Sequence, residues 1–439
     1  MDVRDRVLAR LDGLQEEMVS LLAELVRVDS TTPTLPGVLR ENVIGGETRV
    51  NELLEPRYRA AGLETHWVAE DPERCNLVGV RGGSGGGRSL ALNAHVDTVA
   101  PVTPDSWLTG SPWNPEVRDG YLYGLGSTDM KASGAVMWAV AQALHEEGVR
   151  LAGDLHLHSV IGEETMEHGL GTSAVIRAGF RTDAAVVTEP TSYPRPLTVS
   201  PVAAGVWILR VVVRGKATHA GNRPLAVRPG GPGDSIGVNA LEKGVKIVEA
   251  LLELEQQWGM RKSHPYFSPG FFTIGANVFR ADPGVPFPAY FPNRAAIDYV
   301  VWYPPQEEAD EVAAEIERYV LDACQLDPWL AVVPPEFEWL TNWPPMRTPW
   351  EHQLVQTMAR AHEAATGETL RAPDPAHPVN FGAACDGSFY EAEGIPAVVY
   401  GPGDLKTAHG CNEHVALDET AMAARALALV TLDWCGVVS

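Results

Sequence analysis

The sequence predicts an α/β protein of two domains, in which a ferredoxin-like α+β domain is inserted into a domain built on a mixed, largely parallel sheet. In the outer parts of the chain, apolar runs of strand length alternate with helical stretches, which is typical of α/β sheets. The middle of the chain has the order strand, helix, strand, strand, helix, strand of a ferredoxin-like unit. A chain of 439 residues is also too long for one ordinary hydrophobic core.

The outer domain is expected to comprise residues 1–200 and 341–439. Its first 25 residues predict a helix and not a signal peptide, because their apolar residues recur at helical spacing between charges. A second helix is expected at 130–148. Strands are expected at 75–80, 89–95, 154–162, 183–187 and 395–400. The glycine-rich stretch between the first two strands predicts a hairpin, because no GK[ST] motif for phosphate binding follows it.

The inserted domain is expected at 201–340, between the proline-rich stretches "EPTSYPRPL" and "NWPPMRTPW". Its strands are expected at 205–215, 271–277, 295–302 and 330–339, and its helices at 236–257 and 306–324. The first of these helices carries one apolar face, formed by Leu241, Val245, Val248 and Leu252.

Composition excludes several classes of partner. The 34 Lys and Arg residues against 57 Asp and Glu give a formal net charge of −23, which repels nucleic acid and anionic membranes. No stretch approaches the roughly 18 uninterrupted apolar residues of a membrane span. The five cysteines are scattered and form no CxxC pair, which favours a reducing, cytoplasmic location.

Each apolar run of the outer domain, apart from the first, ends in or leads into side chains that can bind a metal. Those side chains are His95 and Asp97, then Glu163 and Glu164, then Glu189, and finally His409, Glu413 and His414. Asp129 stands where a helix begins. Because ligands bind beyond the carboxyl ends of strands in open α/β sheets, these groups are expected to share one edge.

Taken singly, these residues have ordinary explanations. Asp129 is typical of a helix N-cap, His95 of a hydrogen-bonded core histidine, and Glu163 with Glu164 of a solvated turn. Taken together, several carboxylates at one edge would repel unless a cation compensates them. Imidazole and carboxylate ligands favour zinc, with cobalt or manganese as chemical alternatives. The residues alone do not give the number of ions.

Five ordered motifs resemble those of the M20 family of metallopeptidases and deacylases, which includes acetylornithine deacetylase, succinyl-diaminopimelate desuccinylase, aminoacylase and carboxypeptidase G. The motifs are "HVD", "GLGSTDMKAS", "GEE", "TEP" and "AHGCNE". The resemblance extends over nearly the whole chain. It implies a three-layer metallohydrolase domain with an inserted lid domain through which two copies form a homodimer.

The resemblance also implies a role for each site residue. Two divalent ions would be bridged by Asp129, with His95 and Glu189 on one ion and Glu164 and His409 on the other. Asp97 would accept the second N–H of His95 and so fix its tautomer. Glu163 would be the general base that takes a proton from the metal-activated water.

The inserted domain contributes two further candidates by resemblance. His219, in "GKATHAG", would stabilise the oxyanion in the neighbouring subunit's site, and Asn277 would contact substrate. The alternative for each is a loop residue without a ligand.

The chain departs from the family pattern where many members have an arginine that binds the substrate's α-carboxylate. Trp302 stands there, so either Arg280 or Arg294 replaces that arginine or the substrate has no such carboxylate. "GLGSTDMKAS" also has Leu125 in place of the usual arginine.

The expected activity is removal of an N-acyl group from an amino acid or related small amine. Alternatives are a dipeptidase or carboxypeptidase, and a deacylase or deformylase of a heteroaromatic amine. A binding protein without turnover is the alternative of another class, although such a protein has no need of Glu163.

Overall fold

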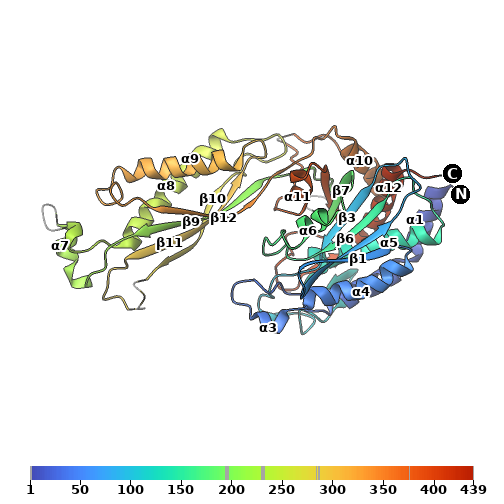
Figure 1. Cartoon of the computed structure of the whole chain (residues 1–439), viewed down its shortest axis with the longest axis horizontal. Coiled ribbons are helices and arrows are strands. Elements are labelled where there is room, and N and C mark those ends of the chain that lie inside the picture. Colours follow the sequence, from blue (N-terminus) through green and yellow to red (C-terminus); the bar gives the residue numbers. More distant parts are fainter. Residues whose placement is uncertain are drawn as a thin grey trace. The chain divides into compact units, whose positions relative to one another are not determined.

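The structure is a computed structural model that describes residues 2–192, 197–228, 233–282, 284, 287–374 and 376–438. The chain forms two compact units, and many of their helices and strands are labelled in Figure 1. The first unit comprises Met1–Ala203, Met346–Pro373 and Val379–Ser439, and the second comprises Ala204–Pro345 and Asp374–Pro378.

A six-stranded sheet forms the centre of the first unit. Its strands, in spatial order, are β1 (Glu64–Asp71), β2 (Arg74–Arg81), β6 (Leu155–Val160), β3 (Leu90–His95), β7 (Ala184–Pro190) and β14 (Ala397–Gly401). The β6–β3, β3–β7 and β7–β14 pairs are parallel, and the two pairs at the β1 end are antiparallel. The prediction of a mixed, largely parallel sheet is therefore confirmed.

Two groups of helices cover this sheet (Figure 1). One group, whose members contact one another, is α1 (Val3–Gly13), α2 (Gln15–Val26), α4 (Gly46–Ala60), α5 (Ala132–Glu146), α10 (Gln353–Thr366) and α12 (Leu417–Cys435). The other is α6 (Thr172–Arg177) and α11 (Gly387–Ala392), which contact each other and the sheet. Because helices lie on both faces, β3, β6 and β7 are buried along their whole length. Across the described residues, every helix is too short or too polar to cross a bilayer.

Smaller elements complete the first unit. They are α3 (Arg40–Val43), the three-stranded sheet of β4 (Glu116–Arg118), β5 (Tyr121–Tyr123) and β15 (His414–Ala416), and the pair β8 (Val202–Ala203) with β13 (Met346–Arg347).

The predicted hairpin of the strands at 75–80 and 89–95 is wrong. β2 and β3 both pair with β6, which lies between them, and β2 forms its hairpin with β1. The glycine-rich loop instead runs beside the start of β6. A Cβ at Gly83 would lie 2.5 Å from the carbonyl oxygen of Ala152, and one at Gly87 would lie 2.2 Å from that of Cys435. Gly83 and Gly87 therefore allow close backbone approach, whereas Gly85 and Gly86, with φ of +95° and +85°, form the bend between them.

The second unit has the ferredoxin-like order expected from the sequence. Its elements are β9 (Gly205–Arg214), α7 (Arg223–Val227), α8 (Ala240–Arg261), β10 (Ile274–Ala281), β11 (Arg294–Tyr303), α9 (Ala309–Cys324) and β12 (Glu336–Trp343). The strands form an antiparallel sheet in the order β10-β11-β9-β12. α8 and α9 pack against each other and share one apolar core with the sheet.

The apolar face singled out for the first helix of this unit is not the face that packs on the sheet. In α8, Leu241, Val245 and Leu252 are exposed, and of the four residues only Val248 packs against the core, in which Ile247 and Leu251 are buried. Apolar residues occupy more than one side of this helix, so the sequence spacing did not identify the inward side.

Candidate metal centre

The carboxyl ends of three parallel strands deliver most of the predicted site residues to one edge of the central sheet. His95 is the last residue of β3, Glu189 lies near the end of β7, and Glu163 and Glu164 occupy the turn after β6. Asp129 precedes α5, and His409 lies in the loop after β14. The fold therefore brings together six side chains that are far apart in sequence.

The Asp129 carboxylate lies between the two imidazoles. Its Oδ1 is 3.0 Å from His95 Nε2, and its Oδ2 is 3.3 Å from His409 Nε2. His95 Nε2 is also 3.5 Å from Glu189 Oε1, and His409 Nε2 is 2.9 Å from Glu164 Oε2. These contacts place His95 with Glu189, and His409 with Glu164, on either side of Asp129.

The spacing of the donor atoms fits a divalent cation. Ligand atoms of a tetrahedral ion with bonds of about 2.0–2.1 Å lie about 3.3 Å apart. Two groups of side chains offer ligand atoms that all lie within 4.8 Å of one another, namely His95 with Glu163 and Glu189, and His95 with Asp129 and Glu164. Nitrogen and carboxylate oxygen are donors that zinc, cobalt and manganese all accept.

The electrostatics of the cluster also call for a cation. The four carboxylates of Asp129, Glu163, Glu164 and Glu189 would leave two net negative charges even against two protonated imidazoles. Burial, with neighbouring carboxylates, raises the pKa of Glu163 and of Glu189 well above the usual range. For His95, burial acts to lower the pKa, but the charges of Glu189 and Asp129 outweigh it and raise the pKa well above its ordinary value. Bound protons thus neutralise the carboxylates of the metal-free site, as a bound cation would do in their place.

Asp97 differs from its expected arrangement. His95 Nδ1 is 3.1 Å from the main-chain carbonyl oxygen of Asp97 and 3.6 Å from its carboxylate, so the main chain is the closer partner that orients the imidazole. The carboxylate instead accepts the main-chain N–H groups of Glu163 and Glu164, at 3.3 and 3.0 Å. Asp97 therefore holds the turn that carries the two glutamates.

Two further buried carboxylates lie near the site, and the family resemblance assigned a role to neither of them. Glu413 accepts the main-chain N–H groups of Thr128 and Asp129, at 2.9 and 3.0 Å, and burial raises its pKa to about 8. Asp386 precedes α11, and burial raises its pKa to about 6; its charge adds to the raised pKa of Glu163. Glu413 was visible within "AHGCNE", whereas no local pattern distinguishes Asp386 from a surface aspartate.

His219 and Asn277 belong to the second unit, and both are exposed. His219 accepts the N–H of Gly221 through Nδ1, at 3.0 Å, and Asn277 lies on β10. Their expected roles in oxyanion and substrate binding stay predictions.

The fold and the donor set define a metal-dependent hydrolase. Comparison with known proteins agrees, because residues 91–433 match the family described as Peptidase family M20/M25/M40. The chain belongs to this family, as its motifs indicated, and is a metallo-amidohydrolase.

Two curated relatives carry the same name, N-formyl-4-amino-5-aminomethyl-2-methylpyrimidine deformylase. The protein from Halalkalibacterium halodurans is 29% identical, over 99% of this chain and 98% of its own length. The protein from Bacillus subtilis is 33% identical, over 79% of each chain. An acetylornithine deacetylase from Myxococcus xanthus is 27% identical over 94% of this chain and 97% of its own.

A solved structure shares the fold over the full chain. Human carnosine dipeptidase 1 superposes with a TM-score of 0.71 at 15% identity, covering 99% of both chains.

Proposed function

We propose that the protein hydrolyses the formamide bond of an N-formylated aminomethylpyrimidine or a closely similar heteroaromatic amine, and releases formate. The observation that carries this proposal is the similarity to the two deformylases, which extends over 99% and 79% of the chain. The compound named for both relatives has an aromatic ring and no carboxylate.

Trp302 supports the choice of substrate. This residue stands where the family resemblance implies an arginine for the α-carboxylate of an amino acid. It lies half-buried on β11, edge-on to Phe271, with ring centroids 6.2 Å apart. An indole can stack on a heteroaromatic ring but cannot form the bidentate pair that a carboxylate prefers.

We further propose that the site holds two zinc ions, with Asp129 between them, His95 and Glu189 on one, and Glu164 and His409 on the other. When bound, such ions lower the pKa of water and polarise a carbonyl group. Cobalt and manganese satisfy the same donor set.

The chain's own residues then move the proton. Glu163 takes a proton from the attacking water and gives it to the departing nitrogen. Asp97 keeps Glu163 in place through the main-chain N–H.

The second unit is proposed as the lid and as the surface of a homodimer, with His219 and Asn277 facing the bound substrate. The exposed apolar side chains of Leu241, Val245 and Leu252 on α8 support a dimer, because a second copy would remove them from water. A cytoplasmic location agrees with five cysteines that form no disulfide in the described residues.

A substrate panel tests the proposal. The panel contains the N-formyl aminomethylpyrimidine, N-acetylornithine, other N-acyl amino acids and dipeptides, and released amine is measured. We expect the formyl compound to have the highest kcat/KM, and Trp302→Arg to lower it while raising turnover of carboxylated substrates. A higher kcat/KM on N-acyl amino acids would favour the second candidate, a deacylase similar to the Myxococcus xanthus relative. A higher kcat/KM on dipeptides would favour a peptidase.

A further inference from the structure

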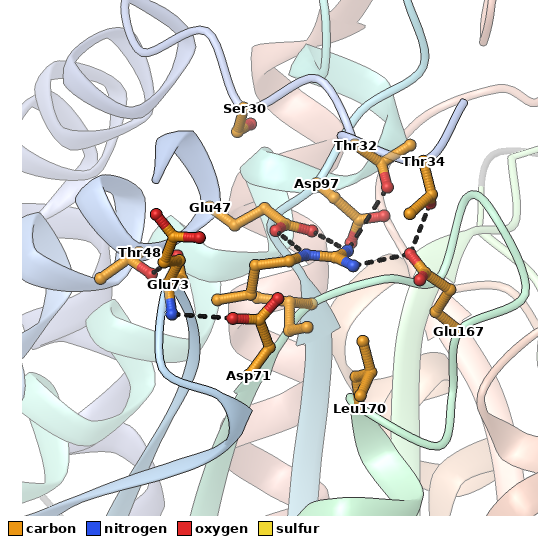
Figure 2. Close-up of polar contacts among 12 residues, drawn as sticks. Ser30, Thr32, Thr34, Glu47, Thr48, Asp71, Glu73, Asp97, Glu167 and Leu170 are labelled. Carbon is orange, nitrogen blue, oxygen red and sulfur yellow. Dashed lines mark hydrogen bonds and ion pairs between the residues drawn. The ribbon is translucent and has the colours of Figure 1, made fainter. Parts of the chain in front are cut away.

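A buried charged cluster lies beside the metal centre and takes no part in the mechanism above. Its centre is Arg74, the first residue of β2, which is 1% exposed. Two carboxylates from different elements meet its guanidinium: Glu47 from the first turn of α4, and Glu167 from the loop after β6 (Figure 2).

The guanidinium binds both carboxylates at the same time. Arg74 Nε donates to Glu47 Oε2 at 2.6 Å, and Nη2 donates to Glu47 Oε1 at 2.8 Å, which makes a bidentate pair. Nη1 points to the other carboxylate and donates to Glu167 Oε2 at 2.7 Å. A planar fork can satisfy two carboxylates in fixed directions, whereas a lysine ammonium cannot.

Glu167 is held from a second direction as well. Its Oε2 accepts the hydroxyls of Thr34, at 2.6 Å, and Thr165, at 3.0 Å. Figure 2 shows Thr34 next to Glu167, on the side away from Glu47. One oxygen of Glu167 therefore receives three hydrogen bonds and fixes the end of its loop.

This loop is the one that carries the two catalytic glutamates. The N–H of Glu167 donates to the carbonyl of Gly162 at 2.7 Å, and the N–H of Met166 donates to that of Glu163 at 2.9 Å, so residues 162–167 form one closed turn. Asp97 holds the beginning of the turn through Glu163 and Glu164. The Arg74 cluster holds its end.

The turn also packs directly on the cluster. Gly162 has φ +76°, and a Cβ there would lie 3.0 Å from Glu167 Cβ and 3.3 Å from Arg74 Nη2. Met166 has a positive φ of 63°, which an L-residue adopts at a cost. A turn with this backbone needs contacts that hold it, and the Arg74 cluster supplies them.

We propose that Arg74 is a positioning residue for the hydrolysis, which acts through Glu167 and Glu47 to hold the turn that places Glu163 as base and Glu164 as ligand. This inference rests on the proposed function. Burying one cation with two anions gives little net stability, so fixing the geometry of a turn is the use that accounts for the cluster.

Glu167→Ala is the principal test, because it releases the turn and leaves the buried Arg74–Glu47 pair intact. Glu73→Ala is the matched control, since Glu73 adjoins Arg74 in sequence but is exposed and pairs with Arg40 at the surface. Glu167→Gln is the rescue variant, because its amide oxygen can still accept hydrogen bonds from these donors. Arg74→Lys keeps the positive charge and removes the planar guanidinium that binds both carboxylates.

Three measurements are made on the full-length protein. Amide hydrogen exchange of a peptide that covers 161–171 reports the turn directly, and zinc affinity is measured by chelator competition. Steady-state kinetics on the formyl substrate separate kcat from KM.

We expect Glu167→Ala and Arg74→Lys to speed exchange in this peptide, to weaken zinc binding about 10–100-fold and to lower kcat by a similar factor. KM should change less than about threefold, Glu167→Gln should recover most of the loss, and Glu73→Ala should match the wild-type protein.

Unchanged exchange in Glu167→Ala overturns the inference, whatever the activity. Faster exchange with unchanged zinc affinity and kcat also overturns it, because the cluster would then be purely structural. If the wild-type protein fails to cleave the formyl substrate, the proposed function is wrong. Hydrogen exchange and zinc affinity, which need no substrate, then still decide whether Arg74 positions the turn.

Discussion

The metal centre of the first unit and Asp327 of the second unit are two buried acidic sites that are compensated in opposite ways. Asp327 Oδ2 lies 2.7 Å from Lys243 Nζ and also forms an ion pair with Lys246. The same carboxylate accepts hydrogen bonds from the main-chain N–H groups of Trp329 and Leu330. In the described part of the chain, the ion-pair partners of the metal-centre carboxylates are His95 and His409.

This difference teaches how to separate a functional site from a structural one. A carboxylate with its own lysines is neutralised by the chain and contributes to the fold. A group of four carboxylates with only imidazoles retains negative charge, so an external cation completes it. The Arg74 cluster is intermediate, because it has one fixed cation for two carboxylates.

The largest effect is expected from removing the cation. Treatment with a chelator should abolish turnover and lower the unfolding midpoint, since a ligand that binds the folded state stabilises it. Added zinc should restore both, as followed by activity and thermal unfolding. Full activity of protein shown to be free of metal would contradict the claim that the first acidic site, unlike Asp327, needs an external cation.

The second largest effect is expected from Glu163→Gln, which removes the general base and keeps the size of the side chain. kcat should fall about 10³-fold, within the range for general acid–base catalysis. Zinc affinity should change little, in contrast to Glu164→Gln, which removes a ligand. Equal loss of zinc in both variants, measured by chelator competition, would show that Glu163 binds metal instead.

A smaller effect, on stability alone, is expected from Asp327→Asn. Burial acts to raise the pKa of Asp327, but hydrogen bonds from Lys243 and Lys246 outweigh it and hold the pKa well below the usual range. A carboxyl whose pKa is lowered by folding stabilises the fold when the pH is above the pKa of the unfolded chain, near 3.9. This contribution is lost as the pH falls through the pKa of the folded protein.

At pH 7 the Asn variant should therefore be less stable by about 2 kcal/mol in urea unfolding. The difference from the wild-type protein should narrow below about pH 4. A difference that stays constant between pH 7 and pH 3 would contradict this account of Asp327.

The smallest effect is expected from Glu336→Gln, which breaks an exposed pair with Arg214 on the same unit. Solvent and salt screen such pairs, so the urea midpoint should not change measurably. A loss of stability as large as that of Asp327→Asn would show that burial does not explain why the two ion pairs differ in strength.

Sequence reasoning was most accurate where the signal was local. His95, Glu163 and Glu189 lie at or just after the ends of buried strands, and the structure places them at one edge, because parallel strands present their carboxyl ends together. It failed where the signal depended on distant parts of the chain. The hairpin was wrong because β6, more than 60 residues after β3 begins, inserts between β2 and β3.

The sequence by itself determined the strand and helix order of the ferredoxin-like unit, the side chains at the sheet edge and the family of the protein, because strand ends and motifs are properties of short segments. Only the tertiary structure decided which strands are neighbours, which side of α8 is buried, and that Asp386 and Arg74 lie near the site. The physical reason is that burial and charge compensation arise between residues far apart in the chain, and the residue spacing within one segment cannot predict them.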